Sequence, residues 1–198
     1  MGGVIAASKP LNMLAQLKQH RFSLERYEAM IERGILTEDD RVELIHGAIV
    51  DVSPVGDRHT ACVKRLIRLF AEIPAQAVTV SIRDPVALPP DSEPEPDAAL
   101  LKPREDFYER AKPRGQDVLL IVEVADSSLQ FDRDVKMPLY AQAGICEAWL
   151  VDVDARVVEV YTEPRDGRYS QLHTYRAGEK IIPAAFPEYS FSVDKIVK

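Results

Sequence analysis

The sequence predicts one domain of mixed α/β or α+β structure, in which helices pack on a central, largely antiparallel sheet. Two observations carry this prediction. Apolar residues recur at helical spacing in some segments and at every second position in others, and these are the periods of helices and strands. In addition, an apolar strand that leads into Glu123 is followed by a helix at about 132–143 and then by the strand "EAWLVDV". This order places a crossover helix against a mixed sheet.

Length and composition are those of a single globular domain. The chain has 198 residues, of which 46% are hydrophobic, and this is enough for a core. We expect residues 1–22, which are weakly patterned, to form a loose N-terminal arm, and residues 23–198 to form the domain. No apolar run approaches the roughly 20 residues of a membrane span, and no signal-peptide pattern is visible, so a cytoplasmic location is expected.

The charge balance disfavours a protein dedicated to coating nucleic acid. The formal net charge is −7, whereas a protein that coats nucleic acid carries a basic footprint. An enzyme with one local basic groove remains compatible with this charge.

The first half of the chain alternates helix and strand signals. Ser23 is suited to cap a helix that Gly34 ends, and "RVELIHGAIVDVSP" predicts a hairpin that turns at His46-Gly47. A second helix is predicted at about 58–73. Short strands follow at "AVTVSI" and "DAALL", on either side of a proline-rich acidic segment that cannot be helical.

The second half contains the strand, the crossover helix and the remaining strands. Asp132 is the expected cap of the helix at about 132–143, and Pro138 inside that helix is expected to cost a hydrogen bond and bend it. The strands "EAWLVDV" and "RVVEVYT" are joined by a tight turn at Asp154-Ala155, and the tail is mostly extended.

Two acids and one lysine carry the chemistry. Taken alone, Glu123 is most simply the first solvent-facing residue of its strand. However, Glu123 is expected to end its strand and Asp97 to begin a short strand 26 residues earlier, so the two strands can pair and bring both carboxylates to one edge of the sheet. Hard oxygen ligands of this kind select Mg²⁺ or Mn²⁺. Lys136 on the crossover helix completes an arrangement for metal-assisted hydrolysis of phosphodiesters.

These residues also carry a resemblance to a known family. The segments "RVELIHGAIVDVSP", "EPDAALL", "LLIVEVADSSLQFDRDVKMPLYAQAGICEAWLVDV" and "YRAGEKI" resemble successive signatures of the Uma-type restriction endonuclease family, within the PD-(D/E)XK nuclease superfamily. The resemblance runs from about Ser23 to Val197. It implies a restriction-endonuclease-like core, with a mixed sheet flanked by helices, and divalent-metal cleavage of phosphodiester bonds.

The resemblance also assigns roles to single residues. Asp97 matches the acid of the "PD" element, Glu123 the acid of the "(D/E)XK" element, and Glu43 an upstream acid. The superfamily's lysine normally stands two residues after the second acid, where this chain has Ala125. Lys136 resembles a migrated replacement for it.

The resulting prediction is a divalent-metal-dependent endonuclease. Its expected catalytic residues are Glu43, Asp97, Glu123 and Lys136, and its expected ligands for Mg²⁺ or Mn²⁺ are Asp97, Glu123 and Glu43. The expected substrate is DNA rather than RNA. The chain is expected to form a homodimer, and no membrane association is expected. The alternative is a nuclease fold of weak or no activity that serves as a binding or assembly module.

Several other residues have simpler interpretations. We expect a solvated acidic loop, and not a set of metal ligands, at Asp91, Glu93 and Glu95, because prolines separate these acids. We expect His59 to make a local hydrogen bond at the start of a helix rather than to contact substrate. We expect Arg133 to form an ion pair and its neighbour Asp132 to cap the helix.

The remaining expectations concern cysteines and the tryptophan. Cys62 and Cys146 lie in apolar patterns far apart in sequence, so both are expected to be buried free thiols. Trp149 lies in an apolar strand and is expected in the core.

Overall fold

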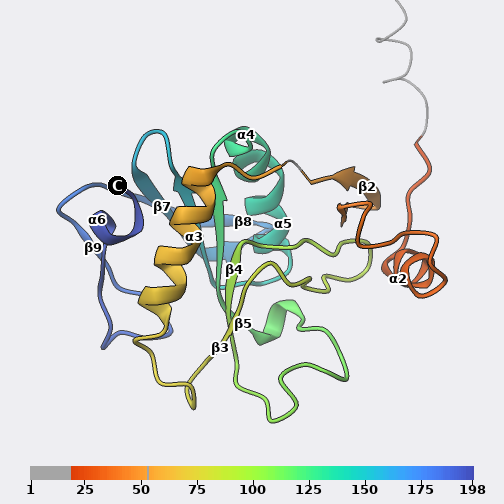
Figure 1. Cartoon of the computed structure of the whole chain (residues 1–198), viewed down its shortest axis with the longest axis horizontal. Coiled ribbons are helices and arrows are strands. Elements are labelled where there is room, and N and C mark those ends of the chain that lie inside the picture. The colour runs from red at the N-terminus through yellow and green to blue at the C-terminus, as the bar shows by residue number, and fades with distance from the viewer. Residues whose placement is uncertain (1–18, 53) are drawn as a thin grey trace, which may run out of the picture.

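The computed structural model describes residues 19–52 and 54–198, and its centre is a six-stranded sheet with the order β3-β4-β5-β6-β7-β8 (Figure 1). The β5–β6 pair is parallel and every other neighbouring pair is antiparallel. The predicted mixed, largely antiparallel sheet is therefore confirmed. Its strands are β3 (Thr79–Ser81), β4 (Ala98–Leu101), β5 (Val118–Ala125), β6 (Glu147–Asp152), β7 (Val157–Arg165) and β8 (Arg168–Tyr175).

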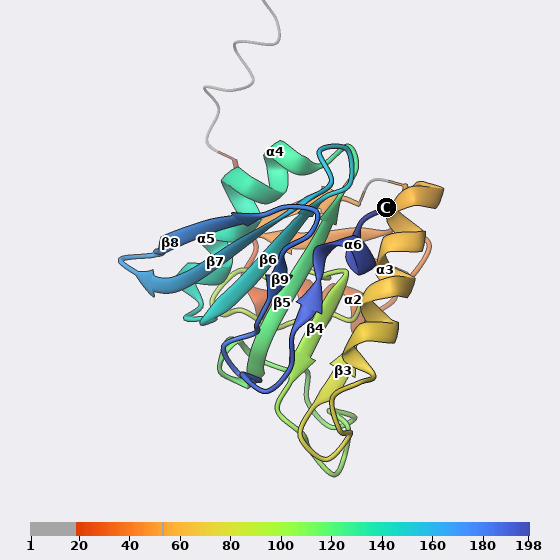
Figure 2. The same ribbon diagram turned by 90° about the vertical axis from the view of Figure 1, so that its left-hand side faces the viewer.

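Helices cover both faces of this sheet (Figure 2). One face packs on α3 and the C-terminal segment, and the other packs on the crossover helix between β5 and β6. The helical elements are α2 (Leu24–Glu32), α3 (Asp57–Phe70), η1 (Gly115–Asp117), α4 (Leu129–Phe131), η2 (Asp132–Lys136), α5 (Met137–Gln142) and α6 (Val193–Ile196). Two small pairs of strands complete the described elements: β1 (Val42–Ile45) with β2 (Ala48–Asp51), and β9 (Lys180–Ile181) with β10 (Phe191–Ser192).

The central strand β5 shows how the alternating pattern divides the core. Val122 and Val124 belong to the cluster on the α3 face, whereas Ile121 and Ala125 belong to the cluster on the α5 face. Since successive side chains of a strand point to opposite faces, Glu123 occupies a position on the α5 face between two apolar residues. The strand also continues for two residues beyond Glu123, so this acid does not end the strand as the sequence suggested.

The predicted hairpin forms, but it lies outside the central sheet. Its turn places His46 at φ 47° and Gly47 at φ 75°, the left-handed conformation that a two-residue hairpin turn requires. A side chain at Gly47 would also bring its Cβ atom to within 2.8 Å of the Arg21 Cβ atom. Leu44 on β1 pairs through its backbone with Glu93, which fixes the hairpin to the loop that precedes β4.

The acidic loop was wrongly predicted to be solvated. Glu93 is buried and its Oε1 atom accepts from the Lys112 Nζ atom at 2.6 Å, while Glu95 is half-buried. The pairing of Leu44 with Glu93 covers this segment, and the sequence of the loop gives no sign of that distant contact.

Two further expectations about burial have different outcomes. Trp149 lies fully in the core, and Cys62 is a buried free thiol, as expected. Cys146 is also a free thiol but it is exposed, because it lies in the turn between Gly144 and β6 and not inside an element.

The crossover helix differs from the predicted one in its start and in its winding. Helical structure begins at Leu129, and residues Asp132–Lys136 form a π-helical turn in which the Met137 N–H donates to the Asp132 carbonyl. Asp132 is therefore inside the helical segment and is not its cap. Pro138 follows directly, in the first turn of α5, where its missing N–H costs little.

Residues 1–18 of the predicted N-terminal arm lie outside the described residues. The end of the arm is attached to the domain, since the Phe22 N–H donates to the Gly47 carbonyl at 2.9 Å. Over the described residues, the helices are too short or too polar to span a lipid bilayer.

Glu147 generates a prediction about stability. Its buried carboxylate accepts from the Trp149 Nε1 atom at 2.6 Å and from the Ala184 N–H at 2.6 Å. Glu147→Leu leaves both donors without a partner, so the free energy of unfolding should fall by about 2–5 kcal/mol. Urea denaturation measures this loss. Glu147→Gln keeps one acceptor and should lose less; an equal loss for the two variants would contradict this role.

Candidate active site

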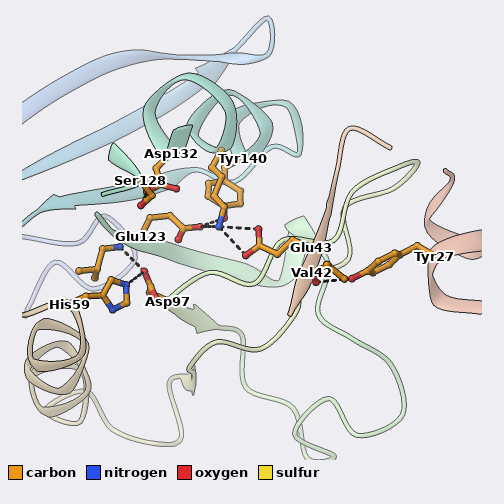
Figure 3. A network of polar contacts seen from close by, with 11 residues as sticks. Tyr27, Val42, Glu43, His59, Asp97, Glu123, Ser128, Asp132 and Tyr140 are labelled. Atoms are coloured by element: carbon orange, nitrogen blue, oxygen red, sulfur yellow. Dashed lines mark hydrogen bonds and ion pairs between the residues drawn. The ribbon is translucent and has the colours of Figure 1, made fainter. Parts of the chain in front are cut away.

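The acids and the lysine predicted from the sequence line one cavity of about 620 Å³. Glu43 comes from the hairpin, Asp97 from the residue before β4, Glu123 from β5, and Lys136 from the π-helical turn. Figure 3 shows Glu123 between Asp97 on one side and Glu43 on the other. The structure thus brings together side chains from four separate segments.

Strand register places the two central acids side by side. Ala98 on β4 is opposite Val122 on β5, so the same register continued by one residue puts Asp97 opposite Glu123. The Asp97 Oδ2 atom accepts from the Val124 N–H at 2.8 Å, which closes the end of this pairing. The two strands pair as the sequence predicted, and both acids line the same cavity.

Lys136 is the buried cation of the site. Its Nζ atom lies 3.1 Å from the Glu43 Oε2 atom and 3.1 Å from the Glu123 Oε1 atom. Burial by itself would lower the pKa of Lys136, but the carboxylates of Glu123 and Glu43 outweigh burial and raise it above its ordinary value. Lys136 is therefore an ammonium ion at neutral pH.

Glu123 is held by two partners on one oxygen. The Tyr140 hydroxyl donates to the Oε1 atom that also contacts Lys136 (Figure 3). Burial raises the pKa of Glu123 well above its ordinary value, and the Lys136 ammonium opposes this shift without cancelling it. Burial, together with the Glu123 charge, raises the pKa of the Tyr140 hydroxyl as well, so that this hydroxyl remains a donor.

The cavity acids differ in how much of each carboxylate is engaged. Within residues 19–52 and 54–198, the Asp97 Oδ1 and Glu123 Oε2 atoms have no hydrogen-bond partner, whereas both oxygens of Glu43 contact Lys136. In the same part of the chain, no group of three or more His, Cys, Asp or Glu side chains is arranged to hold a metal ion. The Lys136 ammonium lies between Glu43 and Glu123 and contacts an oxygen of each.

Asp132 belongs to the cavity although it was expected only as a helix cap. Its Oδ2 atom accepts from the Ser128 hydroxyl at 2.6 Å, and burial raises its pKa against the effect of that hydrogen bond. The neighbouring Arg133 points away and forms the expected ion pair, at 2.7 Å, with Glu159.

His59 makes a distant contact where a local one was predicted. Its Nε2 atom lies 2.9 Å from the Asp97 Oδ2 atom, across 38 residues of sequence. The helix α3 begins beside the cavity, and its first turn directs this ring toward the start of β4 (Figure 3).

Sequence reasoning missed Tyr140 and Glu95. Tyr140 appears in the sequence as one more apolar position of the crossover helix, and only its spacing of four residues from Lys136 indicates that both can face one acid. Glu95 lines the cavity, where burial and the Glu43 charge raise its pKa. Its sequence context, between two prolines, gives no such signal.

Comparison with solved structures shows the class of fold. The chain is similar to a crystal structure described as a putative nuclease belonging to DUF820 from Anabaena variabilis ATCC 29413, with a TM-score of 0.68. The identity is 15%, and the match covers 88% of this chain and 97% of the other. The six-stranded mixed sheet flanked by helices is therefore a nuclease-like fold.

Comparison with family models gives the particular family. Residues 24–194 match the model of Uma2, which is described as a putative restriction endonuclease. The protein belongs to this family, and the family resemblance inferred from the sequence is confirmed. No curated protein matches the chain.

Tyr140 generates a prediction about the stability of the site. Tyr140→Phe removes a donor to a buried carboxylate, so the free energy of unfolding should fall by about 1.5–3 kcal/mol. The matched control is Tyr161→Phe, because the Tyr161 hydroxyl donates at 2.6 Å to Glu159, which also pairs with a cation, Arg133, but is less buried than Glu123. Denaturant unfolding of both variants makes the comparison, and a smaller loss for Tyr140→Phe than for Tyr161→Phe would contradict the assignment.

Proposed function

We propose that the protein is a divalent-metal-dependent endonuclease that hydrolyses DNA phosphodiester bonds. One observation carries the proposal: Asp97 and Glu123 lie opposite each other in strand register on the wall of one cavity, and each leaves one carboxylate oxygen without a partner in the described part of the chain. Membership of the restriction endonuclease family supports the same reaction. The homodimer and the cytoplasmic location remain predictions.

The chemistry of the donor set fits Mg²⁺ or Mn²⁺. Asp97 and Glu123 offer hard oxygen atoms, which these ions prefer, and we propose them as the principal ligands. Glu43 is the proposed third ligand, and to bind the ion it would have to give up one of its two contacts with Lys136. When bound, the ion would supply positive charge to polarise the phosphate that is cleaved.

Lys136 acts in this proposal as a positive charge and not as a base. Its raised pKa keeps the ammonium protonated near neutral pH, so it cannot take a proton from water. Its position between Glu43 and Glu123 lets it stabilise negative charge that develops on a phosphate bound in the cavity. The buried ammonium therefore favours charge stabilisation over deprotonation of the attacking water.

A basic surface beside the cavity supports nucleic acid as the substrate. The helix α3 begins at the cavity, and farther along it Arg65 and Arg68 line shallow hollows together with Lys195 and Lys198. These hollows have volumes of about 180 and 210 Å³. In a protein of net charge −7, such a local group of cations is suited to phosphate contacts.

The first test uses Asp97. Wild-type protein should nick supercoiled plasmid only with Mg²⁺ or Mn²⁺, and Mn²⁺ should raise its melting temperature because the ion binds the folded state. Asp97→Ala should lose both effects. The control is Asp91→Ala, in the same loop but outside the cavity, which should behave as wild type. An equal Mn²⁺-dependent shift in Asp97→Ala and wild type would place the ion elsewhere.

The second test uses Lys136. Lys136→Met leaves Glu43 and Glu123 without their cation, so the free energy of unfolding should fall by about 3–5 kcal/mol and cleavage should be lost. Mn²⁺ should then stabilise the variant more than the wild type, because it can take the place of the ammonium. Lys136→Arg should restore little cleavage, since a planar guanidinium does not fit a buried site built for an ammonium.

The matched control for Lys136 is Lys112→Met. Lys112 also pairs with a buried acid, Glu93, but neither residue lines the cavity. This variant should lose stability and retain plasmid cleavage per folded molecule. Cleavage by Lys136→Met at the wild-type rate, in protein shown to require Asp97, would refute the role given to Lys136.

A binding or assembly module remains the second candidate, and one observation favours it. Lys136 already forms an ion pair with both Glu43 and Glu123, so each of these acids has a cationic partner without a metal ion. A module of this kind would bind DNA equally well with and without Mn²⁺ and would leave supercoiled plasmid intact. Plasmid cleavage that depends on both Mn²⁺ and Asp97 would exclude it.

A further inference from the structure

We infer that His59 is a positioning residue that holds Asp97 in the orientation needed to bind a metal ion. The inference rests on the proposed function, because it concerns the same metal site. It adds a residue from α3 to a site otherwise built from the hairpin, the paired strands and the crossover helix.

The contacts of Asp97 are concentrated on one oxygen. The Oδ2 atom is 2.9 Å from the His59 Nε2 atom and accepts from the Val124 N–H at 2.8 Å. Two contacts from different directions fix the plane of the carboxylate. The Oδ1 atom, which has no partner among the described residues, is thereby kept available to the cavity that Asp97 lines.

The hydrogen-bond network also assigns the proton of His59. The Asp97 Oδ2 atom accepts hydrogen bonds, so the Nε2 atom is the donor in this contact. The Nδ1 atom is buried and has no hydrogen-bond partner among the described residues.

The burial of the ring decides whether His59 positions Asp97 or contacts an ion or substrate directly. Since the Nδ1 atom is covered and the Nε2 atom is occupied by Asp97, neither ring nitrogen is free to contact a substrate or an ion in the cavity. His59 can therefore act only through Asp97. A side chain behind a metal ligand commonly orients it in this way, and its loss typically weakens metal binding about 10–100-fold.

The local structure suits this role. His59 stands in the first turn of α3, and the same helix is anchored in the core through Cys62, Leu66 and Phe70. The ring is thus presented by a rigid element. The competing explanation is that the contact only ties α3 to the sheet, and that explanation predicts a loss of stability without a specific effect on the metal site.

His59→Leu and His59→Gln separate these explanations. Leucine fills much of the ring's space but cannot donate, whereas the glutamine amide can donate to Asp97 from about the position of the Nε2 atom. The buried Nδ1 atom makes no hydrogen bond in the described part of the chain, so we expect His59→Leu to remain folded. A melting curve of each variant checks this first.

The measured quantities are Mn²⁺ affinity by calorimetry, exchange of the Val124 amide by NMR, and kcat and KM for plasmid cleavage. In His59→Leu, Mn²⁺ affinity should fall about ten-fold or more. The Val124 amide should exchange faster, because its acceptor is no longer fixed. The kcat value should fall while KM stays within about two-fold of the wild type. His59→Gln should restore most of each property.

A control and the contrary outcomes complete the test. Ser128→Ala removes a hydrogen bond to another cavity acid, Asp132, and should leave the Val124 amide unchanged. Wild-type Mn²⁺ affinity in His59→Leu would overturn the inference, and so would equal losses in His59→Leu and His59→Gln. If wild-type protein binds Mn²⁺ but does not cut DNA, the proposed nuclease activity fails, while the Mn²⁺ and amide comparisons still decide the role of His59.

Discussion

The ammonium of Lys136 is the interaction on which the site depends. It joins the hairpin through Glu43, the central strand through Glu123, and the crossover helix that carries it. All three side chains are buried, with exposed fractions of 3%, 3% and 6%. Because buried charges are costly unless they are paired, these segments must come together for any of the charges to be tolerated. The need to pair them therefore specifies where the hairpin sits relative to the sheet.

The π-helical turn at Asp132–Lys136 is part of this arrangement. One additional residue in a helical turn rotates everything after it by about 100° relative to what precedes it. The turn thus sets the direction of Asp132 and Lys136 relative to Met137 and Tyr140, which pack in α5. Pro138 is accommodated where the hydrogen-bonding pattern already changes, so the kink expected from its sequence position is absorbed into the turn.

The site divides its carboxylates between two uses. Glu43 is fully engaged by Lys136, while Asp97 and Glu123 each give one oxygen to the protein and leave the other without a partner in the described region. Tyr140 and His59 stand behind these two acids and are themselves buried. Such support limits the side-chain freedom that would otherwise be lost on binding an ion or a phosphate. The carboxylates at the paired strand ends are thus held in place before an ion or a phosphate binds.

Some of this was determined by the sequence itself. The alternation of apolar residues gave the strands, the strand-helix-strand order gave the parallel β5–β6 pair, and the short separation of Asp97 and Glu123 indicated that their strands are neighbours. These features depend on local spacing and chain connectivity, which a sequence displays directly. The family resemblance added Glu43, whose separation of 93 residues from Lys136 no local pattern could bridge.

Only the tertiary structure decided the partners of the buried polar groups. The contacts of His59 with Asp97, of Tyr140 with Glu123 and of Glu93 with Lys112 join residues 17–38 positions apart. His59, Tyr140 and Glu93 each have an ordinary surface or core interpretation in their local context, and the sequence favoured that interpretation. A buried polar group must find a partner within about 3 Å, and which residues lie that close is fixed by how the layers of the fold pack.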